Sequence, residues 1–202
     1  MTDHQIAPDR LSGSQQFRGT GLPGRLLRGR TRDFDIGSLF ERSVVSDELE
    51  AGERRLLCFL LPPWQRPEVW TELQKRRFIE GIFLGLGTGY YVVNQSDWNE
   101  GGALPMSGWL IDGQQRLSAI RDFGAGKLTI FDGLTYGGLT GAEQAGRFKR
   151  IVFPCLEIDY QADESLLRGL YDRLNFGGTA HLESERAEQR ERCERSMRPT
   201  AG

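Results

Sequence analysis

The sequence DGQQR at residues 112–116 is the part of the chain best suited to chemistry. It lies between an apolar run at 109–111 and an amphipathic run at 117–123, which predicts a strand, a tight turn and a helix. Glycine lets the backbone of the turn approach a ligand closely, and the helix start offers free N–H groups to an anion. Arg116 adds a guanidinium suited to phosphate, and Asp112 can hold a metal ion or a water beside it. The motif therefore predicts a phosphate or nucleotide site.

A second interpretation of the same motif needs no ligand. A strand–Asp–Gly–helix junction can be a capped helix, with Asp112 as the N-cap and Arg116 in solvent. A short glycine turn is a weak signal, so the residue pattern alone leaves both interpretations open.

Two other segments carry polar side chains beside turns: Gln65 and Arg66 follow an apolar run, and Arg173 and Asn175 end a predicted helix. If the three segments converge, the arginines would neutralise a triphosphate, a carboxylate would place Mg²⁺ or a water, and the amides would orient the nucleophile. A surface charge is the commoner role for each arginine alone. The candidate catalytic residues are Asp112, Gln115 and Arg116, the candidate nucleotide- or phosphate-binding residues are Gln65, Arg66, Gly113, Gln114, Ser118, Arg173 and Asn175, and Asp112 is also the candidate Mg²⁺ ligand.

Composition excludes several classes of protein. The 202 residues carry a net charge of −2, with 38% hydrophobic and 27% charged residues, which is typical of a globular protein with one core. Three dispersed cysteines give neither a zinc knuckle nor a disulfide framework and favour a reducing, cytoplasmic setting. Two histidines are too few for an HNH nuclease site. We expect no membrane span, because no stretch reaches about 18–20 apolar residues.

Hydrophobic periodicity predicts an α/β (α+β) domain. Strands are expected at 56–61, 90–93, 128–131 and 151–158, with a hairpin turn at 132–133 and helices at 68–84, 117–123 and 163–174. Residues 1–33 are expected to be a disordered or loosely attached basic arm, 34–185 the folded domain, and 186–202 a charged tail. The arm has six arginines against three aspartates, so it could contact a nucleic-acid backbone, although a solvated tail is the commoner role.

Four segments together resemble a known family. In order they are PPWQRPEVW (62–70), FIEGIFLG (78–85), LIDGQQRLSAI (110–120) and LYDRLNFGG (170–178). They resemble the N-terminal domain of GmrSD-type modification-dependent restriction enzymes, which belongs to the ParB/sulfiredoxin-like superfamily, and the resemblance covers about residues 55–185. It implies a small mixed sheet with flanking helices, a DGQQR turn that binds nucleotide phosphate, and hydrolysis of a nucleoside triphosphate that drives or gates action on DNA, often in phage defence.

Three functions follow as hypotheses. The first is a Mg²⁺-dependent nucleoside triphosphate hydrolase that acts with DNA. The second is a nucleotide-gated DNA-binding module without catalysis, and the third is a group-transfer enzyme that modifies a phosphorylated base of phage DNA. The chain has no room for the nuclease domain of the restriction enzymes, so we expect a stand-alone version with a nuclease or modification-enzyme partner.

Overall fold

The computed structural model describes residues 25, 28–45 and 49–176. Its strands are β1 (Gly29–Asp35), β2 (Arg54–Leu56), β3 (Phe59–Leu61), β4 (Tyr91–Asn94), β5 (Trp98–Asn99), β6 (Gly102–Ala103), β7 (Leu110–Asp112) and β8 (Val152–Ile158). Its helices are α1 (Ser38–Glu41), α2 (Glu72–Phe83), α3 (Gln114–Gly124), α4 (Gly141–Gln144) and α5 (Glu164–Phe176), with a 3₁₀ turn at Tyr136–Gly138 and a π-helical turn at Ala145–Lys149. No helix within these described ranges is long and apolar enough to cross a membrane.

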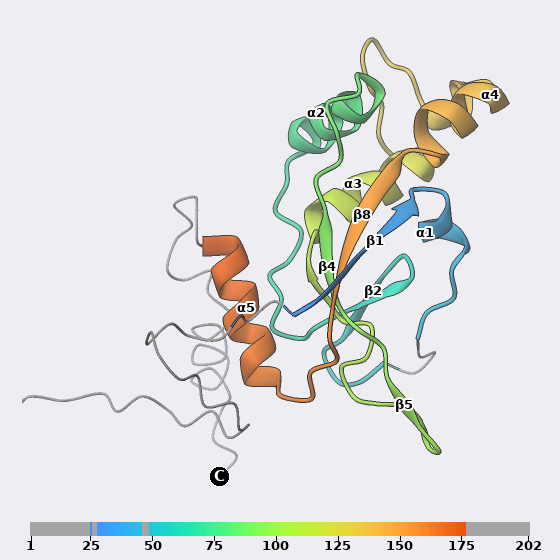
Figure 1. The fold of residues 1–202 in the computed structure, drawn as a ribbon. Helices are drawn as coiled ribbons and strands as arrows, with labels where there is room; N and C mark the ends of the chain where they lie inside the picture. Colours follow the sequence, from blue (N-terminus) through green and yellow to red (C-terminus); the bar gives the residue numbers. More distant parts are fainter. Residues whose placement is uncertain (1–24, 26–27, 46–48, 177–202) are drawn as a thin grey trace, which may run out of the picture.

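The central element is a four-stranded mixed sheet with the order β1-β8-β4-β7 (Figure 1). β8 pairs antiparallel with β1 and parallel with β4. β7 is the edge strand on the other side and pairs antiparallel with β4. The hairpins β2–β3 and β5–β6 form separate two-stranded sheets. The expected α/β fold, a small mixed sheet with flanking helices, is confirmed.

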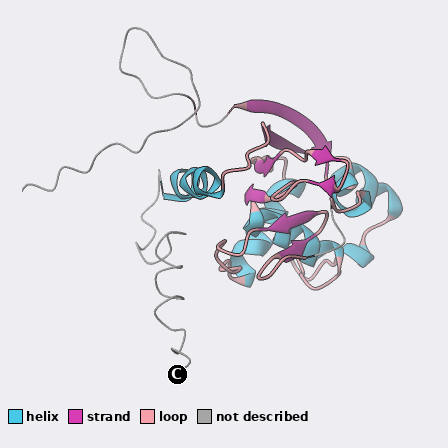
Figure 2. Cartoon of the chain, turned by 90° about the horizontal axis from the view of Figure 1, so that it is seen from below, coloured by secondary structure: helices cyan, strands magenta, loops and turns pink. Residues whose placement is uncertain are grey.

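Two hydrophobic clusters cover the two faces of this sheet. Side chains alternate along β4, so Tyr91 and Val93 join one cluster, whereas Val92 joins the other. The larger cluster packs under α1, α2 and α3, and the smaller one packs under α5. Figure 2 shows α5 set apart from the other helices, on its own side of the sheet. Near the end of β7, α3 therefore packs on one face of the sheet and α5 packs on the other.

Several expected boundaries are wrong, each for a local reason. The expected strand 56–61 is the hairpin β2–β3, which turns at Leu57 with a φ of 54°. Helix α2 begins at Glu72 because Thr71 and Gln74 form a capping box, so residues 68–71 are extended chain instead of helix. The expected hairpin at 132–133 is reduced to a single bridge between Ile130 and Leu134.

The basic arm also ends earlier than expected. Residues 29–33 belong to β1, which pairs along its whole length with β8. Pairing with the long central strand supplies backbone hydrogen bonds that the polar sequence of this segment does not reveal. Residues 1–24 and 26–27 of the expected arm lie outside the described residues. So do residues 177–185 of the expected domain and the expected tail at 186–202.

Candidate functional site

A pocket of about 370 Å³ opens where β7 meets α3. Its size is that of a small-molecule site, for which pockets of about 300–1,000 Å³ are usual. Its lining comes from the segment after β3, from the β7–α3 turn and from the last turns of α5. The lining residues are Gln65, Arg66, Trp70, Asp112, Gly113, Gln114, Gln115, Arg116, Tyr171, Leu174 and Asn175.

The turn is built around Gly113. This glycine has a φ of 103°, and a Cβ atom placed on it would lie 2.5 Å from the Cβ atom of Tyr91. Gly113 is also the N-cap of α3, and no side chain caps the helix there. The interpretation of Asp112 as the capping residue is therefore wrong. The first residues of α3 line the pocket, so the positive end of the helix dipole lies beside it.

Asp112 and Arg116 form an ion pair on the wall of the pocket. The Nη2 atom of Arg116 donates to Oδ2 of Asp112 at 2.9 Å, across one turn of helix, and both side chains are about three-quarters buried. The Nε atom of Arg116 is buried and has no hydrogen-bond partner in the described part of the chain. We call a polar atom of this kind an open atom. Arg116 thus keeps donors for an anion while Asp112 fixes its orientation.

Two glutamines at the pocket carry further open atoms. Gln114 is 4% exposed and both polar atoms of its amide are open atoms. Gln65 is 3% exposed; its Nε2 atom donates to the carbonyl of Ile111 at 3.4 Å, and its Oε1 atom is an open atom. Buried amides are nearly always hydrogen-bonded in folded proteins, so these two glutamines are exceptions among the residues that line the pocket.

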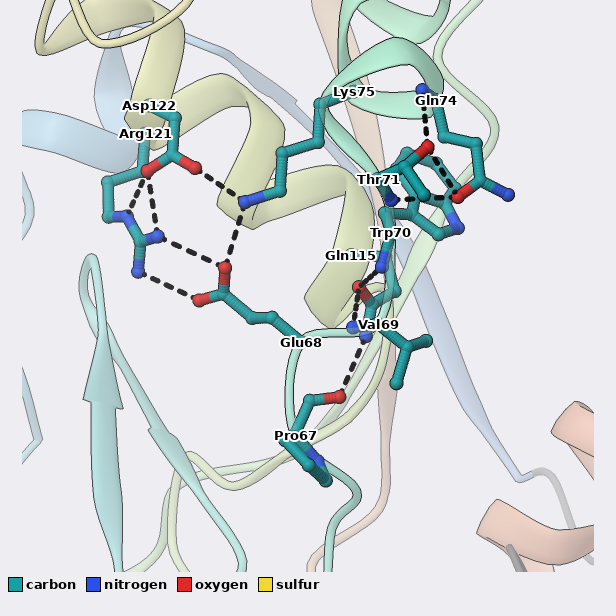
Figure 3. A network of polar contacts seen from close by, with 10 residues as sticks. All are labelled: Pro67, Glu68, Val69, Trp70, Thr71, Gln74, Lys75, Gln115, Arg121 and Asp122. Atoms are coloured by element: carbon teal, nitrogen blue, oxygen red, sulfur yellow. Dashed lines mark hydrogen bonds and ion pairs between the residues drawn. The ribbon is translucent and has the colours of Figure 1, made fainter.

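The side chain of Gln115, which the sequence predicts to be catalytic, is hydrogen-bonded to the backbone of a neighbouring segment. Its Oε1 atom accepts from the backbone N–H groups of Val69 and Trp70 at 3.0 and 3.1 Å, and its Nε2 atom donates to the carbonyl of Pro67 at 3.2 Å (Figure 3). The amide therefore fastens the extended segment 67–70 to α3. Its contacts are those of a positioning residue, and they do not leave the amide aimed at a nucleophile.

A charged network fastens the same segment at a second point (Figure 3). Glu68 accepts from Lys75 at 2.9 Å and from Arg121 at 3.1 Å, and both cations also pair with Asp122. Burial raises the pKa values of Glu68 and Asp122, but the hydrogen bonds from Lys75 and Arg121 outweigh it, so both pKa values lie below their ordinary range. The network joins the pocket wall to α2 and α3.

We expect Glu68→Gln to change the acid sensitivity of the fold. A carboxyl whose pKa is lowered by folding stabilises the protein above its unfolded pKa, near 4.5 for glutamate, and loses that contribution as the pH falls through the folded value. At neutral pH the variant should be less stable by about 1–2 kcal/mol, and the difference should shrink as the pH falls below the unfolded pKa and through the lowered folded one. Urea unfolding at a series of pH values measures this.

Glu72→Gln is the matched control, because the side chain of Glu72 is 71% exposed and its ion pair with Arg76 lies on the surface of α2. Its effect should stay within about 0.5 kcal/mol at neutral pH, as is usual for an exposed pair. Equal effects of the two substitutions at every pH would contradict the role given to Glu68.

Not every expected site residue reaches the pocket. Arg173 is exposed and Ser118 is fully buried, and neither lines the cavity. Arg66 and Arg116 do line it, so two of the three expected arginines converge. Asn175 lines the pocket, but its Nδ2 atom donates to the carbonyl of Tyr171 on its own helix at 2.9 Å.

Tyr171 and Leu174 were not expected at the site. With Asn175 they occupy positions i, i+3 and i+4 of α5, which share one helix face, whereas Arg173 lies on another. Their apolar spacing along the helix is also typical of core packing. Helical spacing could have predicted their place at the pocket, because it groups Tyr171 and Leu174 with Asn175 and places Arg173 on another face.

The donor set can accept a magnesium ion only together with a ligand. No cluster of three or more His, Cys, Asp or Glu residues that could bind a metal exists among the described residues. Asp112 is the only carboxylate among the residues lining the pocket. Magnesium is commonly held by one or two carboxylates plus substrate phosphates and waters, so the pocket fits an ion that arrives with a phosphate-bearing ligand.

The described residues thus define a class, namely α/β domains with a polar pocket at a strand–glycine–helix turn. The family of the GmrSD restriction endonuclease N-terminal domain matches residues 45–189, which is most of the chain, and the chain belongs to this family. No curated protein and no solved structure matches it. Membership connects the chain with DNA restriction in phage defence.

Proposed function

We propose that this pocket binds a nucleoside triphosphate with Mg²⁺ and hydrolyses it, and that the hydrolysis is coupled to an action on DNA. The observation that carries the proposal is that Arg66, Arg116 and the first residues of α3 line one pocket. Guanidinium groups and a helix N-terminus at one cavity are the arrangement that stabilises phosphate oxygens. Family membership supports the connection with DNA.

The roles of the residues follow from their contacts. The remaining donors of Arg116 and the N–H groups of α3 would bind the phosphate chain, and Arg66 would approach it from the segment after β3. Gln115 and Glu68 would act indirectly, because they hold the segment that follows Arg66. Mg²⁺, held by Asp112 and the phosphates, would neutralise charge that develops on the phosphate oxygens.

Hydrolysis requires a water beside the terminal phosphate. In this reaction the water oxygen bonds to the terminal phosphorus, the bond from that phosphorus to the bridging oxygen breaks, and one water proton is released. The Asp112 carboxylate lies at the pocket wall, where it could accept that proton or position the water. Its ion pair with Arg116 would hold it in a fixed orientation for either role.

Phosphate release tests the proposal. The whole chain is mixed with Mg²⁺ and each common nucleoside triphosphate, with and without DNA, beside the isosteric variant Asp112→Asn. We expect release from the unaltered protein and a loss of about 100-fold or more in the variant, because the variant keeps the shape of the side chain and removes its charge. Equal release by both proteins would sink the proposal.

Two other outcomes would point to the alternative functions. Nucleotide that stays intact but changes the affinity for DNA would indicate a gated DNA-binding module. New nucleosides found by mass spectrometry in treated phage DNA would indicate a base-modification enzyme.

A further inference from the structure

A short basic turn follows α4 at residues 147–150, where the sequence is RFKR. It completes the π-helical segment Ala145–Lys149, which the backbone N–H of Arg150 closes by donating to the carbonyl of Ala145 at 2.9 Å. Single π-helical turns are rare in proteins and frequently lie at functional sites. This one places three exposed cations within four residues, namely Arg147, Lys149 and Arg150.

Phe148 anchors the basic turn in the core. It is 1% exposed, and its ring packs against the rings of Phe83 at the end of α2 and Phe123 near the end of α3, with centroids 6.1 and 5.2 Å away. The Nη2 atom of Arg147 also donates to the carbonyl of Phe83 at 2.6 Å. The backbone of the turn is therefore held on two helices, while Lys149 and Arg150 stay at the surface.

The charge of the basic turn is not offset by ion pairs, unlike the charge of β1. Lys149 and Arg150 form no side-chain hydrogen bond or ion pair within the described residues. On β1, by contrast, Arg30 and Arg32 both pair with Glu157, at 3.0 and 2.6 Å. The arginines of the expected basic arm that the structure describes on β1 are thus partly neutralised, and the basic turn carries the less compensated charge.

Two carboxylates on neighbouring elements are used to start helices. Glu143 of α4 accepts from the backbone N–H and the hydroxyl of Thr140, both at 2.8 Å, in a capping box. Asp35 at the end of β1 accepts from the backbone N–H of Ser38 at 2.7 Å. Neither carboxylate forms an ion pair with the basic turn within the described ranges, so the surface of the turn stays positive.

We propose, on the basis of the coupling to DNA put forward above, that the basic turn binds the sugar–phosphate backbone of duplex DNA. Exposed arginines and lysines supply phosphate contacts of this kind, which fix the position of a protein on the duplex without reading its bases. Because the whole chain has a net charge of −2, contact with DNA requires a local concentration of positive charge such as this turn. Membership of a restriction-endonuclease family favours DNA as the polyanion.

Helix α3 connects the basic turn with the pocket. Gln114 at its start lines the pocket, and Phe123 near its end contacts Phe148. The helix has 11 residues, so the two sites lie about 16 Å apart along it. Figure 1 shows α4, which leads into the basic turn, well apart from α5, whose last turns line the pocket. DNA on the turn would thus leave the pocket free for nucleotide and act as an effector of its hydrolysis.

Fluorescence anisotropy of a short labelled duplex, titrated with the whole chain at several salt concentrations, tests this surface. The double variant Lys149→Gln/Arg150→Gln removes two cations that hold no other group, so its fold should persist, which thermal melting checks. We expect binding about 10-fold weaker at low salt. The slope of log affinity against log salt concentration should fall by about 2, since each lost phosphate contact lowers it by about 1.

Arg30→Gln/Arg32→Gln is the matched control, because it removes the same charge from exposed positions of β1. Its affinity for the duplex should stay within about twofold of the unaltered protein. Equal losses in the two double variants would mean that total charge determines binding, and a loss confined to the β1 variant would place the DNA on that strand. Either result would overturn the proposal, as would undiminished binding by the variant of the basic turn.

Phosphate release without DNA separates this inference from the proposed function. Lys149 and Arg150 do not line the pocket, so their double variant should keep the basal rate within about twofold. If the unaltered protein releases no phosphate but the turn variant loses duplex binding, the proposed function falls and the DNA surface stands. Phosphate release by a protein that binds no duplex, or binds single strands only, would overturn the DNA surface alone.

Discussion

Arg116→Ala is expected to lower nucleotide turnover by about 100- to 1,000-fold, which corresponds to about 3–4 kcal/mol of transition-state stabilisation. The substitution removes the guanidinium of a residue that lines the pocket and also leaves the Asp112 carboxylate without its 2.9 Å ion pair. Steady-state phosphate release with Mg²⁺ measures the loss. Both effects act at the pocket, so the fold should persist.

Arg173→Ala is the matched control, because Arg173 carries the same charge, is exposed on α5 and does not line the pocket. Its turnover should stay within about twofold of the unaltered protein, since a surface substitution away from the site changes little. Equal losses in the two variants would mean that overall charge, and not the geometry of the pocket, controls turnover.

Gly113→Ala is expected to destabilise the fold by about 2–5 kcal/mol. The alanine would have to adopt a φ near 103°, which is strained for any side chain, and its Cβ atom would lie within 2.5 Å of the Cβ atom of Tyr91. Tyr91 is fully buried in the central strand β4, so it cannot move without disturbing the core. Urea unfolding measures the free-energy change.

Gly87→Ala separates strain from crowding. Gly87 has a φ of 91°, and a Cβ atom added to it meets nothing within 4 Å. The control should therefore cost only about 1 kcal/mol, the strain of the backbone alone. If Gly113→Ala costs no more than Gly87→Ala, the close packing of the turn against Tyr91 does not constrain this position.

The local patterns predicted the elements that hold the site. Residues 109–123 fold as the expected strand, turn and helix, and the expected strand 151–158 and helix 163–174 correspond to β8 and α5. In each segment the apolar residues follow one period, and glycine or polar residues mark the ends. Such signals depend on neighbouring residues, so a single sequence contains them.

The contacts between distant segments could not be predicted in the same way. Gln115 bonds residues 67–70, which are more than 40 positions away, and no pattern around residue 115 predicts this contact. Arg173 and Asn175 are two residues apart, yet only Asn175 reaches the pocket, because the helix places them on different faces. The strand at 29–35 likewise depends on its pairing with β8.

Hydrogen–deuterium exchange with and without Mg²⁺ and a non-hydrolysable nucleoside triphosphate tests most directly whether this pocket binds nucleotide. The pocket predicts slower exchange in peptides that cover 112–118 and 64–70, since their backbone N–H groups lie at the ligand or in the segment that Gln115 holds. The hairpin β5–β6 does not line the pocket and should be unchanged. An unchanged exchange rate in peptides that cover 112–118, while nucleotide is bound, would contradict the account.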